Sequence, residues 1–525
     1  MRSRSIKIVA CLIALAGCAN DPEKARDPTI NPEDADGDGY TPAQGDCDDD
    51  NASINPGTAE APYNGVDDDC DDTTSDDDVD GDGLSQDQDC DDASPTPGAA
   101  ETMVTGDLVW DGTDLELCSD GRTLGVQGNL TLSPSLSTVE GLECLCIVDG
   151  DLLIQDSELV DLSGLDQLKQ VTGTLQIDGN RALQSLTGLS MLSSIGNNVY
   201  IFGNDLLVNM QGLQPLRSVG YNFEVSGNMA MVNLEGLEGL ELIGDGLFVW
   251  ENPALVSLAG LNALETISGY IYLEKNDVLS SLVGLHNLRV IEGNLELWEN
   301  PELVDLTGLD SLEEIVFELQ IRNNDGLEHL TGLGALHTIG ASFELRDNPS
   351  LLDVHGLDGL TEVVGYMDIE NNNSLASFEG FAALESVGGF FYIERNDVLV
   401  DLAGFSSLKN LPGNVEITEN DSLVSIGGMT ELTEIGNSLE IRGNSSLENL
   451  DGLDKLVSIS SSIRVEQNFA LTDVGALTEL TAVGRDFIFK DNVSLPTSDI
   501  EYVAFEVIGF ESIGGTITIT GNNDD

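Results

Sequence analysis

The stretch Leu247-Phe-Val-Trp-Glu-Asn252-Pro-Ala-Leu255-Val-Ser-Leu258-Ala-Gly260-Leu261-Asn-Ala-Leu264-Glu-Thr-Ile267 contains the repeat on which most of this chain is built. Its asparagine recurs every 24 residues, fourteen times without a miss, from Asn180 to Asn492. We call these residues the ladder asparagines. A globular core has no reason to keep a fixed period, whereas a coil stacked on identical coils must present the same groups to its neighbour. The period therefore predicts a solenoid.

The apolar positions around each ladder asparagine predict where the strand lies. The residues five and three positions before it are apolar in every coil, as at Leu247 and Val249. This alternation is typical of a short strand with one buried face. Three positions after the asparagine, leucine occurs in thirteen of fourteen coils, with Met231 as the exception. We expect one strand per coil, a continuous parallel sheet, and little room for a long helix in each coil.

The pattern resembles leucine-rich repeats (L-x-x-L-x-L-x-x-N) and, in its spacing, the receptor L domains. It departs from leucine-rich repeats by a longer gap before the strand and by one extra residue between Asn and Leu. The predicted fold is mainly β, a right-handed parallel β-solenoid of 24-residue coils over residues 151–525. We expect an amino-terminal cap of imperfect coils at residues 103–150. A second cap should follow Pro496, where about six extra residues precede a last coil ending at Asn522.

Charge limits the possible partners. The 525 residues include 94 Asp and Glu but only 20 Lys and Arg, which gives a formal net charge of −74. Phosphate binding needs clustered Lys and Arg, so nucleic acid is excluded as an expected partner. A polyanion of this strength attracts cations.

The amino terminus has the features of an export signal. Arg2, Arg4 and Lys7 precede an apolar run over residues 8–16, which is too short to span a bilayer. The following Leu-Ala-Gly-Cys18 resembles the lipobox of bacterial lipoproteins. The resemblance implies cleavage before Cys18, a lipid on its sulfur and, because residue 19 is not Asp, an outer-membrane anchor. We assign residues 1–17 to the signal and residues 18–33 to a flexible tether. The alternative is an ordinary secretory signal with a stray cysteine.

The six cysteines that follow Cys18 fit an exported, oxidising location. They are Cys47, Cys70, Cys90, Cys118, Cys144 and Cys146. Six cysteines allow fifteen pairings. We favour a Cys47–Cys70 bridge because both residues lie in the Asp-rich segment, and we expect no bond between Cys144 and Cys146, which are too close in sequence.

The Asp-rich segment, residues 34–102, contains two near-copies of D-x-D-G-D-G followed by D-C-D-D. Few of its residues are aliphatic, so it cannot fold by burying apolar surface. Carboxylates at positions 1, 3 and 5 of a loop, a glycine at 6 and a carbonyl at 7 are the pattern that calcium takes. The predicted ligands are Asp34, Asp36, Asp38, Tyr40 and Asp46 in the first copy, and Asp78, Asp80, Asp82, Leu84 and Asp89 in the second.

These loops have no flanking helix pattern, so they are not EF-hands. They resemble the calcium repeats of thrombospondin type-3 modules and dockerins, and the metal-binding repeat near the start of many bacterial surface proteins. The resemblance implies Ca²⁺ and a segment that metal stabilises. The alternative is an acidic, disordered spacer that lifts the rest of the chain off the membrane.

The outward-facing strand positions are the candidate recognition surface. They lie two and four residues before each ladder asparagine, 28 sites in all, and seven of them are aromatic. In leucine-rich repeats such positions line the ligand-binding face, and Trp, Tyr and Arg are common anchors of interfaces. The predicted ligand-binding residues are Tyr200, Phe202, Phe248, Trp250, Tyr272, Trp298, Arg322 and Arg346. The seventh aromatic is Tyr392, and cross-strand packing is the alternative role for these rings.

Catalysis has little support in the sequence. The four histidines, at 286, 329, 337 and 355, occupy four different phases of the repeat and cannot stack into one site. We therefore predict a lipid-anchored, calcium-binding surface protein that is not an enzyme and that recognises a protein or a glycan. A structural envelope scaffold is the first alternative, and a polysaccharide-acting enzyme is the second.

Overall fold

A computed structural model describes residues 34–58, 67–70, 90, 100–113, 117–118 and 122–524. The chain divides into two compact units, Met1–Gly83 and Leu84–Asp525. Predictions that concern Cys18, Asp78, Asp80, Asp82, Leu84 and Asp89 lie outside the described residues.

The first unit is held by turns and a disulfide. In its described residues the regular structure is one 3-10 helix, η1 (Pro42–Gln44). The predicted bridge between Cys47 and Cys70 is confirmed, with their Cα atoms 5.6 Å apart. The Asn55 N–H donates to the Asp68 carbonyl at 2.9 Å, so the same two segments are also joined through the backbone.

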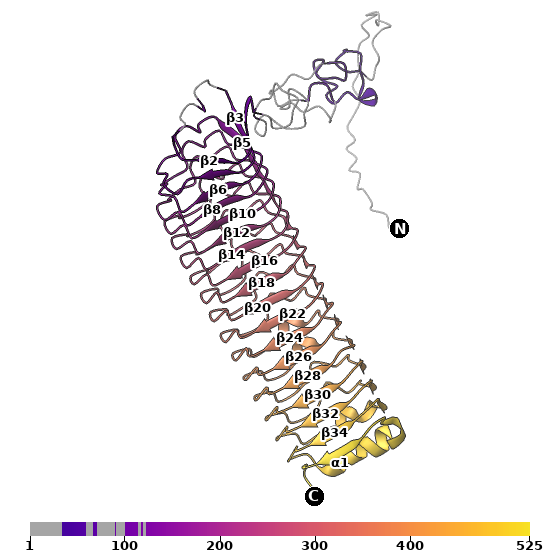
Figure 1. Cartoon of the computed structure of the whole chain (residues 1–525). Coiled ribbons are helices and arrows are strands. Elements are labelled where there is room, and N and C mark those ends of the chain that lie inside the picture. The colour runs from indigo at the N-terminus through magenta and orange to yellow at the C-terminus, as the bar shows by residue number, and fades with distance from the viewer. Residues whose placement is uncertain are drawn as a thin grey trace, which may run out of the picture. The chain divides into compact units, whose positions relative to one another are not determined.

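The second unit is a parallel β-solenoid, and Figure 1 shows its coils following one another along a straight rod. Its longer sheet pairs each strand with the equivalent strand of the next coil in register, for example Leu247 with Ile271 and Trp250 with Glu274. The strands in order are β2 (Leu108–Trp110), β4 (Leu130–Leu132), β6 (Leu152–Gln155), β8 (Leu175–Asp178), β10 (Val199–Phe202), β12 (Phe223–Ser226), β14 (Leu247–Trp250), β16 (Ile271–Glu274), β18 (Leu295–Trp298), β20 (Leu319–Arg322), β22 (Phe343–Arg346), β24 (Met367–Glu370), β26 (Phe391–Glu394), β28 (Val415–Thr418), β30 (Leu439–Arg442), β32 (Ile463–Glu466), β34 (Phe487–Lys490) and β35 (Ile517–Thr520).

The prediction of one strand per coil was wrong, because nearly every coil has a second strand, which in most coils is the shorter of the two. These strands form a parallel ladder of their own. They are β1 (Thr102–Thr105), β3 (Leu124–Gln127), β5 (Leu145–Val148), β7 (Gln170–Val171), β9 (Ser194–Ile195), β11 (Ser218–Val219), β13 (Leu242–Ile243), β15 (Thr266–Ile267), β17 (Val290–Ile291), β19 (Glu314–Ile315), β21 (Thr338–Ile339), β23 (Glu362–Val363), β25 (Ser386–Val387), β27 (Asn410–Leu411), β29 (Glu434–Ile435), β31 (Ser458–Ile459) and β33 (Ala482–Val483). Most have only two residues, too few to give an alternating pattern.

Helices are short throughout the described residues, as the repeat predicts. They are η2 (Glu379–Phe381), η3 (Ala403–Phe405), η4 (Gly475–Glu479), α1 (Thr497–Tyr502), the π-helical η5 (Val503–Ile508) and η6 (Phe510–Ser512). The last three occupy the insertion after Pro496 and cover the final coil. Strand β35 then pairs with β34, which confirms that a last coil follows the extra residues.

The core is a column of leucine, isoleucine and valine layers. Nearly every apolar residue predicted to face inward is 0% exposed, including Leu247, Val249, Leu255 and Leu258. A glycine lets the coils approach closely. Gly236 has a φ of +113°, and a Cβ there would lie 2.1 Å from the Met210 carbonyl oxygen of the preceding coil. A side chain at this position would force the coils apart.

The ladder asparagines hold the coils in register. The Asn372 N–H donates to Asn396 Oδ1 at 3.1 Å, and its Nδ2 donates to the Leu345 carbonyl at 2.8 Å. The same pattern runs to Asn492, whose N–H donates to Asn522 Oδ1. All fourteen are 0% exposed. Buried backbone groups need partners, so the ladder asparagines have a structural role in every coil.

Disulfides also tie the start of the solenoid. Cys118 bonds Cys144, and Cys90 bonds Cys146. Cys90 and Cys146 are buried together with Ala100 and Ile147 in a small cluster beside the main core. Cys144 and Cys146 thus have separate partners, as expected.

Candidate functional site

The first Asp-rich loop brings Asp34, Asp36 and Asp38 together. One carboxylate oxygen of each lies within 4.8 Å of the others. The loop folds this way because its carboxylates accept hydrogen bonds from the backbone N–H groups of residues that follow them in the sequence. Asp34 accepts from the N–H groups of Gly37 and Gly39, at 2.7 and 3.1 Å, and Asp38 accepts from the Tyr40 N–H at 2.8 Å. Gly37 and Gly39 both have positive φ, which lets the chain reverse around the carboxylates.

Three carboxylate oxygens in this loop are buried without a hydrogen-bond partner: Oδ2 of Asp36, of Asp38 and of Asp46. The pKa of Asp36 is raised, first by desolvation and then by the negative charges of Asp38, Asp46 and Asp34. Asp46 is not part of the group within 4.8 Å, although its charge acts on Asp36. Buried oxygens that face one another without donors are a typical set of ligands for a hard cation.

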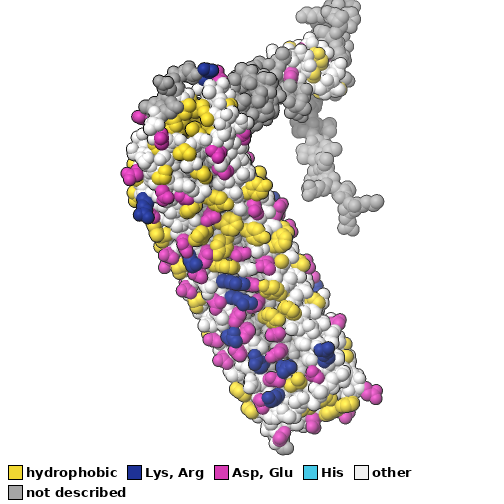
Figure 2. All heavy atoms as spheres, in the orientation of Figure 1, with side chains coloured by type: hydrophobic (Ala, Val, Ile, Leu, Met, Phe, Trp, Pro, Cys, Tyr) yellow, Lys and Arg dark blue, Asp and Glu magenta, His cyan; other side chains and the backbone are white. Residues whose placement is uncertain are grey.

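The candidate recognition surface is the outer face of the longer sheet. Phe202, Trp250 and Trp298 lie two residues before their ladder asparagines, and Tyr200, Phe248 and Tyr272 lie four before. Their neighbours inward along the strands are 0% exposed, whereas these rings are partly exposed and Phe202 is 36% exposed. In Figure 2 hydrophobic side chains gather over the middle coils, and Lys and Arg lie beside them among Asp and Glu.

The aromatic rings contact one another across coils. The Phe248 and Tyr272 rings are 6.4 Å apart, and the Tyr272 and Trp298 rings meet edge to face at 5.4 Å. The Tyr272 hydroxyl donates to the Glu274 carboxylate. Burial, followed by this hydrogen bond, raises the pKa of Tyr272. Burial would also raise the pKa of Glu274, but hydrogen bonds from Lys275 and Tyr272 outweigh it and lower that pKa.

Arg322 and Arg346 continue the column beyond Trp298. The Arg322 guanidinium lies over the Trp298 ring, 5.4 Å from its centroid, and forms an ion pair with Glu344. Arg346 pairs with Asp368 and, at 3.4 Å, with Glu370. The two arginines are therefore neutralised within the face, and the Glu344 and Asp368 carboxylates are nearly buried.

Acidic groups dominate the charged half of this face. Burial raises the pKa of Asp368 despite the opposing charge of Arg346, and burial followed by the charge of Glu440 raises the pKa of Glu416. Burial also raises the pKa of Glu394, despite the opposing charge of Arg395. This half of the face is a network of compensated charges, in contrast to the aromatic half.

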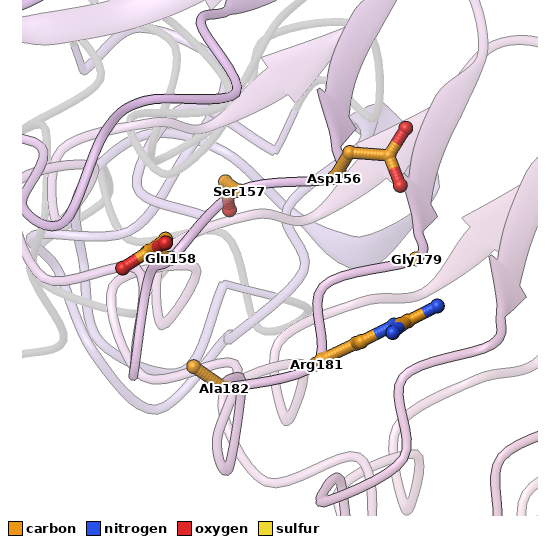
Figure 3. Close-up of a pocket in the computed structure, with 6 residues that line it drawn as sticks. All are labelled: Asp156, Ser157, Glu158, Gly179, Arg181 and Ala182. Carbon is orange, nitrogen blue, oxygen red and sulfur yellow. The ribbon is translucent and has the colours of Figure 1, made fainter.

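A pocket that the sequence did not predict lies where the ladder begins (Figure 3). It is lined by Asp156, Ser157, Glu158, Gly179, Arg181 and Ala182. Ser157 takes the place of an asparagine, because its N–H and hydroxyl both donate to Asn180 Oδ1, at 2.9 and 2.6 Å. Ser157 lies 23 residues before Asn180, and not 24, so the period of the ladder did not reveal this role. The hydroxyl is engaged in the ladder, so the pocket gains no nucleophile from it.

The histidines stay apart, as predicted from their phases. His329 contacts Asp353 at 3.1 Å and His355 contacts Asp358 at 3.6 Å, both near the surface. No helix in the described part of the chain has the length and hydropathy needed to cross a bilayer.

The chain matches the model of the Cu-binding_MopE family, described as a "Putative metal-binding motif", over residues 46–76 and 89–107. The two matches begin at Asp46 and Asp89, the acids predicted to close the two loops. No curated protein sequence matches the chain. Among solved structures it is similar to a leucine-rich repeat protein from Bacteroides ovatus, with 10% identity, a TM-score of 0.36, and coverage of 66% of this chain and 91% of that one.

Proposed function

We propose that this protein is a lipid-anchored, calcium-binding recognition protein of the cell surface, and that the outer sheet face of its solenoid binds a protein or a glycan. The observation that carries the recognition role is a cluster of partly exposed aromatic side chains on one sheet face, with ring contacts from Phe248 through Tyr272 to Trp298, in a chain of net charge −74. Exposed apolar surface of this kind usually marks an interaction site. The irregular loops that would build a catalytic cleft have no counterpart in coils of nearly constant length.

Calcium fits the first loop better than copper, although the matched family is named for copper. The available donors at Asp34, Asp36, Asp38 and Asp46 are all carboxylate oxygens, which suit hard cations such as calcium. Copper favours imidazole and sulfur ligands. The first histidine in the sequence is His286, and Cys47 and Cys70 are joined in a disulfide.

Titration calorimetry of the full chain with Ca²⁺, Mg²⁺ and Cu²⁺ tests the metal. We expect calcium to bind most tightly, and the double variant Asp36→Asn with Asp38→Asn to weaken it at least about tenfold, or ~1.4 kcal/mol. Asp161→Asn, a surface change in the solenoid, is the matched control. Preferential binding of copper would reject calcium as the cofactor while retaining a metal site.

The recognition role is tested by the double variant Trp250→Ala with Trp298→Ala. It should lose capture of protein or glycan from envelope and extracellular extracts while its thermal melt stays within a few degrees of the parent. Tyr221→Ala is the control, because this ring is 56% exposed but lies outside the aromatic surface. Undiminished capture by the double variant would reject this face as the binding site, and no capture even by the parent protein would favour the scaffold hypothesis.

The lipid anchor rests on the lipobox resemblance at Cys18. Cys18→Ser should move the protein from the membrane fraction to the soluble exported fraction, and metabolic labelling with a fatty acid should be lost with it. An unchanged membrane fraction would argue against the anchor.

A further inference from the structure

We propose that the ligand of the solenoid face is an uncharged β-1,4-linked polysaccharide, laid along the solenoid over a row formed by Phe202, Trp250 and Trp298. This inference deepens the recognition function proposed above and rests on it.

The row has a fixed spacing of two coils. In the sheet register Phe202 lies opposite Ser226 and Ser226 opposite Trp250; Trp250 then lies opposite Glu274, and Glu274 opposite Trp298. Aromatic and polar residues therefore alternate along one straight column. Neighbouring strands are about 4.8 Å apart, so the backbone positions that carry the aromatic residues repeat every ~9.6 Å.

The surface between the rings is flat and has no groove. The Trp250 indole N–H donates to Glu224 of the preceding coil at 3.1 Å, which draws the ring back across that coil. Ser226, which lies in the same preceding coil, is only 3% exposed. A ligand must therefore lie on top of the row. Arg322, positioned over Trp298, closes the row at its carboxy-terminal end.

Peptide conformations match this row poorly. An extended strand presents the same side every ~6.7 Å, and a helix presents residues i and i+7 about 10.5 Å apart. A polyproline helix repeats every ~9.3 Å, which fits the spacing, but its prolines dock into grooves between aromatic rings. The covered Ser226 leaves no such groove.

A β-1,4-linked glycan has the required shape. It is a flat ribbon in which alternate sugars present the same face, and each sugar advances the chain by close to one inter-strand spacing. Apolar sugar faces would lie over Phe202, Trp250 and Trp298, and the intervening sugars beside Glu224 and Glu274.

The polar groups at the row suit hydroxyls. Glu224, Glu274 and Glu296 border the rings and can accept hydrogen bonds, and they would repel an anionic polymer. The Trp298 indole N–H is buried and has no partner within the described residues. Such a donor is costly when unpaired, and a ligand that shifts the Trp298 ring outward could supply its acceptor.

The test is titration calorimetry of the full chain with cellohexaose and chitohexaose as probes. Maltohexaose, whose α-linked chain curls, and a polyproline peptide are the comparison ligands. We expect binding of at least one β-1,4-linked probe and of neither comparison ligand. The decisive variant is the exchange Trp250→Ser with Ser226→Trp, which keeps the composition but breaks the two-coil spacing. It should weaken binding at least about tenfold, and Tyr221→Ala should leave it unchanged.

The outcomes separate the two proposals. If the exchange variant binds the glycan as well as the parent does, the spacing argument is wrong. If neither β-linked probe binds while Trp250→Ala with Trp298→Ala still abolishes capture from extracts, the polysaccharide is rejected and a protein ligand retained. Binding of the polyproline peptide would also overturn this inference. Failure of both experiments would reject the recognition function itself.

Discussion

The two units of this protein solve the problem of burying polar groups in opposite ways. In the solenoid, each buried asparagine amide meets backbone groups and the next amide in the column. In the Asp-rich loop, one oxygen each of Asp36, Asp38 and Asp46 is buried with no donor. The first arrangement is complete by itself, whereas a cation would complete the second. The two units should therefore respond independently to changes aimed at each.

The largest expected effect is from Asn372→Ala. It would leave the Asn348 N–H and the Leu345 carbonyl without their partners. Each unpaired buried group costs about 1–3 kcal/mol, so we expect the free energy of unfolding of the solenoid to fall by about 4 kcal/mol in denaturant titrations followed by circular dichroism. Calcium affinity should not change.

The neighbouring Asn373→Ala is the control for this change, because Asn373 is exposed. It should shift stability by no more than about 0.5 kcal/mol. Equal effects of the two substitutions would mean that the ladder contributes nothing specific.

Removing the Cys47–Cys70 bridge should affect only the first unit. A disulfide that closes a loop of this length stabilises by about 3 kcal/mol, and Asp46 precedes Cys47 directly. We expect Cys47→Ser with Cys70→Ser to make residues 34–70 sensitive to protease even with calcium present, and to weaken calcium binding. EDTA should produce the same sensitivity in the parent protein.

The comparison variant is Cys118→Ser with Cys144→Ser, which removes a bridge of the solenoid. It should loosen the start of the second unit and leave calcium binding as it was. If this variant weakened calcium binding as much as the first, the two units would not be independent.

Most of the fold could be predicted because one contact repeats. The ladder asparagine needs the same partners in every coil, so its period appears directly in the sequence, and the strand before it has an alternating pattern. The last coil was also predictable, since Asn522 restores the ladder after the insertion. The two-residue strands were missed because two residues carry no period, and Ser157 was missed because its spacing is 23.

For the candidate sites, the sequence predicted which positions the residues occupy in the repeat but not which side chains contact one another. The sequence places Trp298, Arg322 and Arg346 in one column, but not the ion pairs that neutralise the arginines, because Glu344 and Asp368 lie on the parallel column four residues before the ladder. Side-chain direction decides which charges meet, and it depends on packing between coils. In the acidic loop the spacing of the aspartates was enough, because each one caps its own turn.

A smaller effect should follow from pH. Asp368, Glu394 and Glu416 have raised pKa values in the folded protein, so they bind protons more tightly folded than unfolded. Stability of the solenoid should therefore rise as the pH falls from 7 toward these raised pKa values, by at most about 1 kcal/mol after screening. Calcium binding should weaken over the same range. Glu416→Gln should reduce the gain in the solenoid without altering calcium binding.

The smallest effect concerns the backbone beside the ladder. Glu251, which directly precedes Asn252, has a φ of +54°, and Gly227 holds the equivalent position with a φ of +62°. The left-handed conformation costs a residue with a side chain about 1–2 kcal/mol, part of which glycine loses again through the entropy of the unfolded chain. We expect Glu251→Gly to stabilise the solenoid by about 0.5 kcal/mol, and Gly227→Ala to destabilise it by about 1 kcal/mol, both in thermal melts. A Cβ at Gly227 would meet nothing closer than 3.8 Å, so its cost would come from the backbone alone. If Glu251→Gly instead destabilised the solenoid, the glutamate side chain would have to contribute more than the strain it imposes.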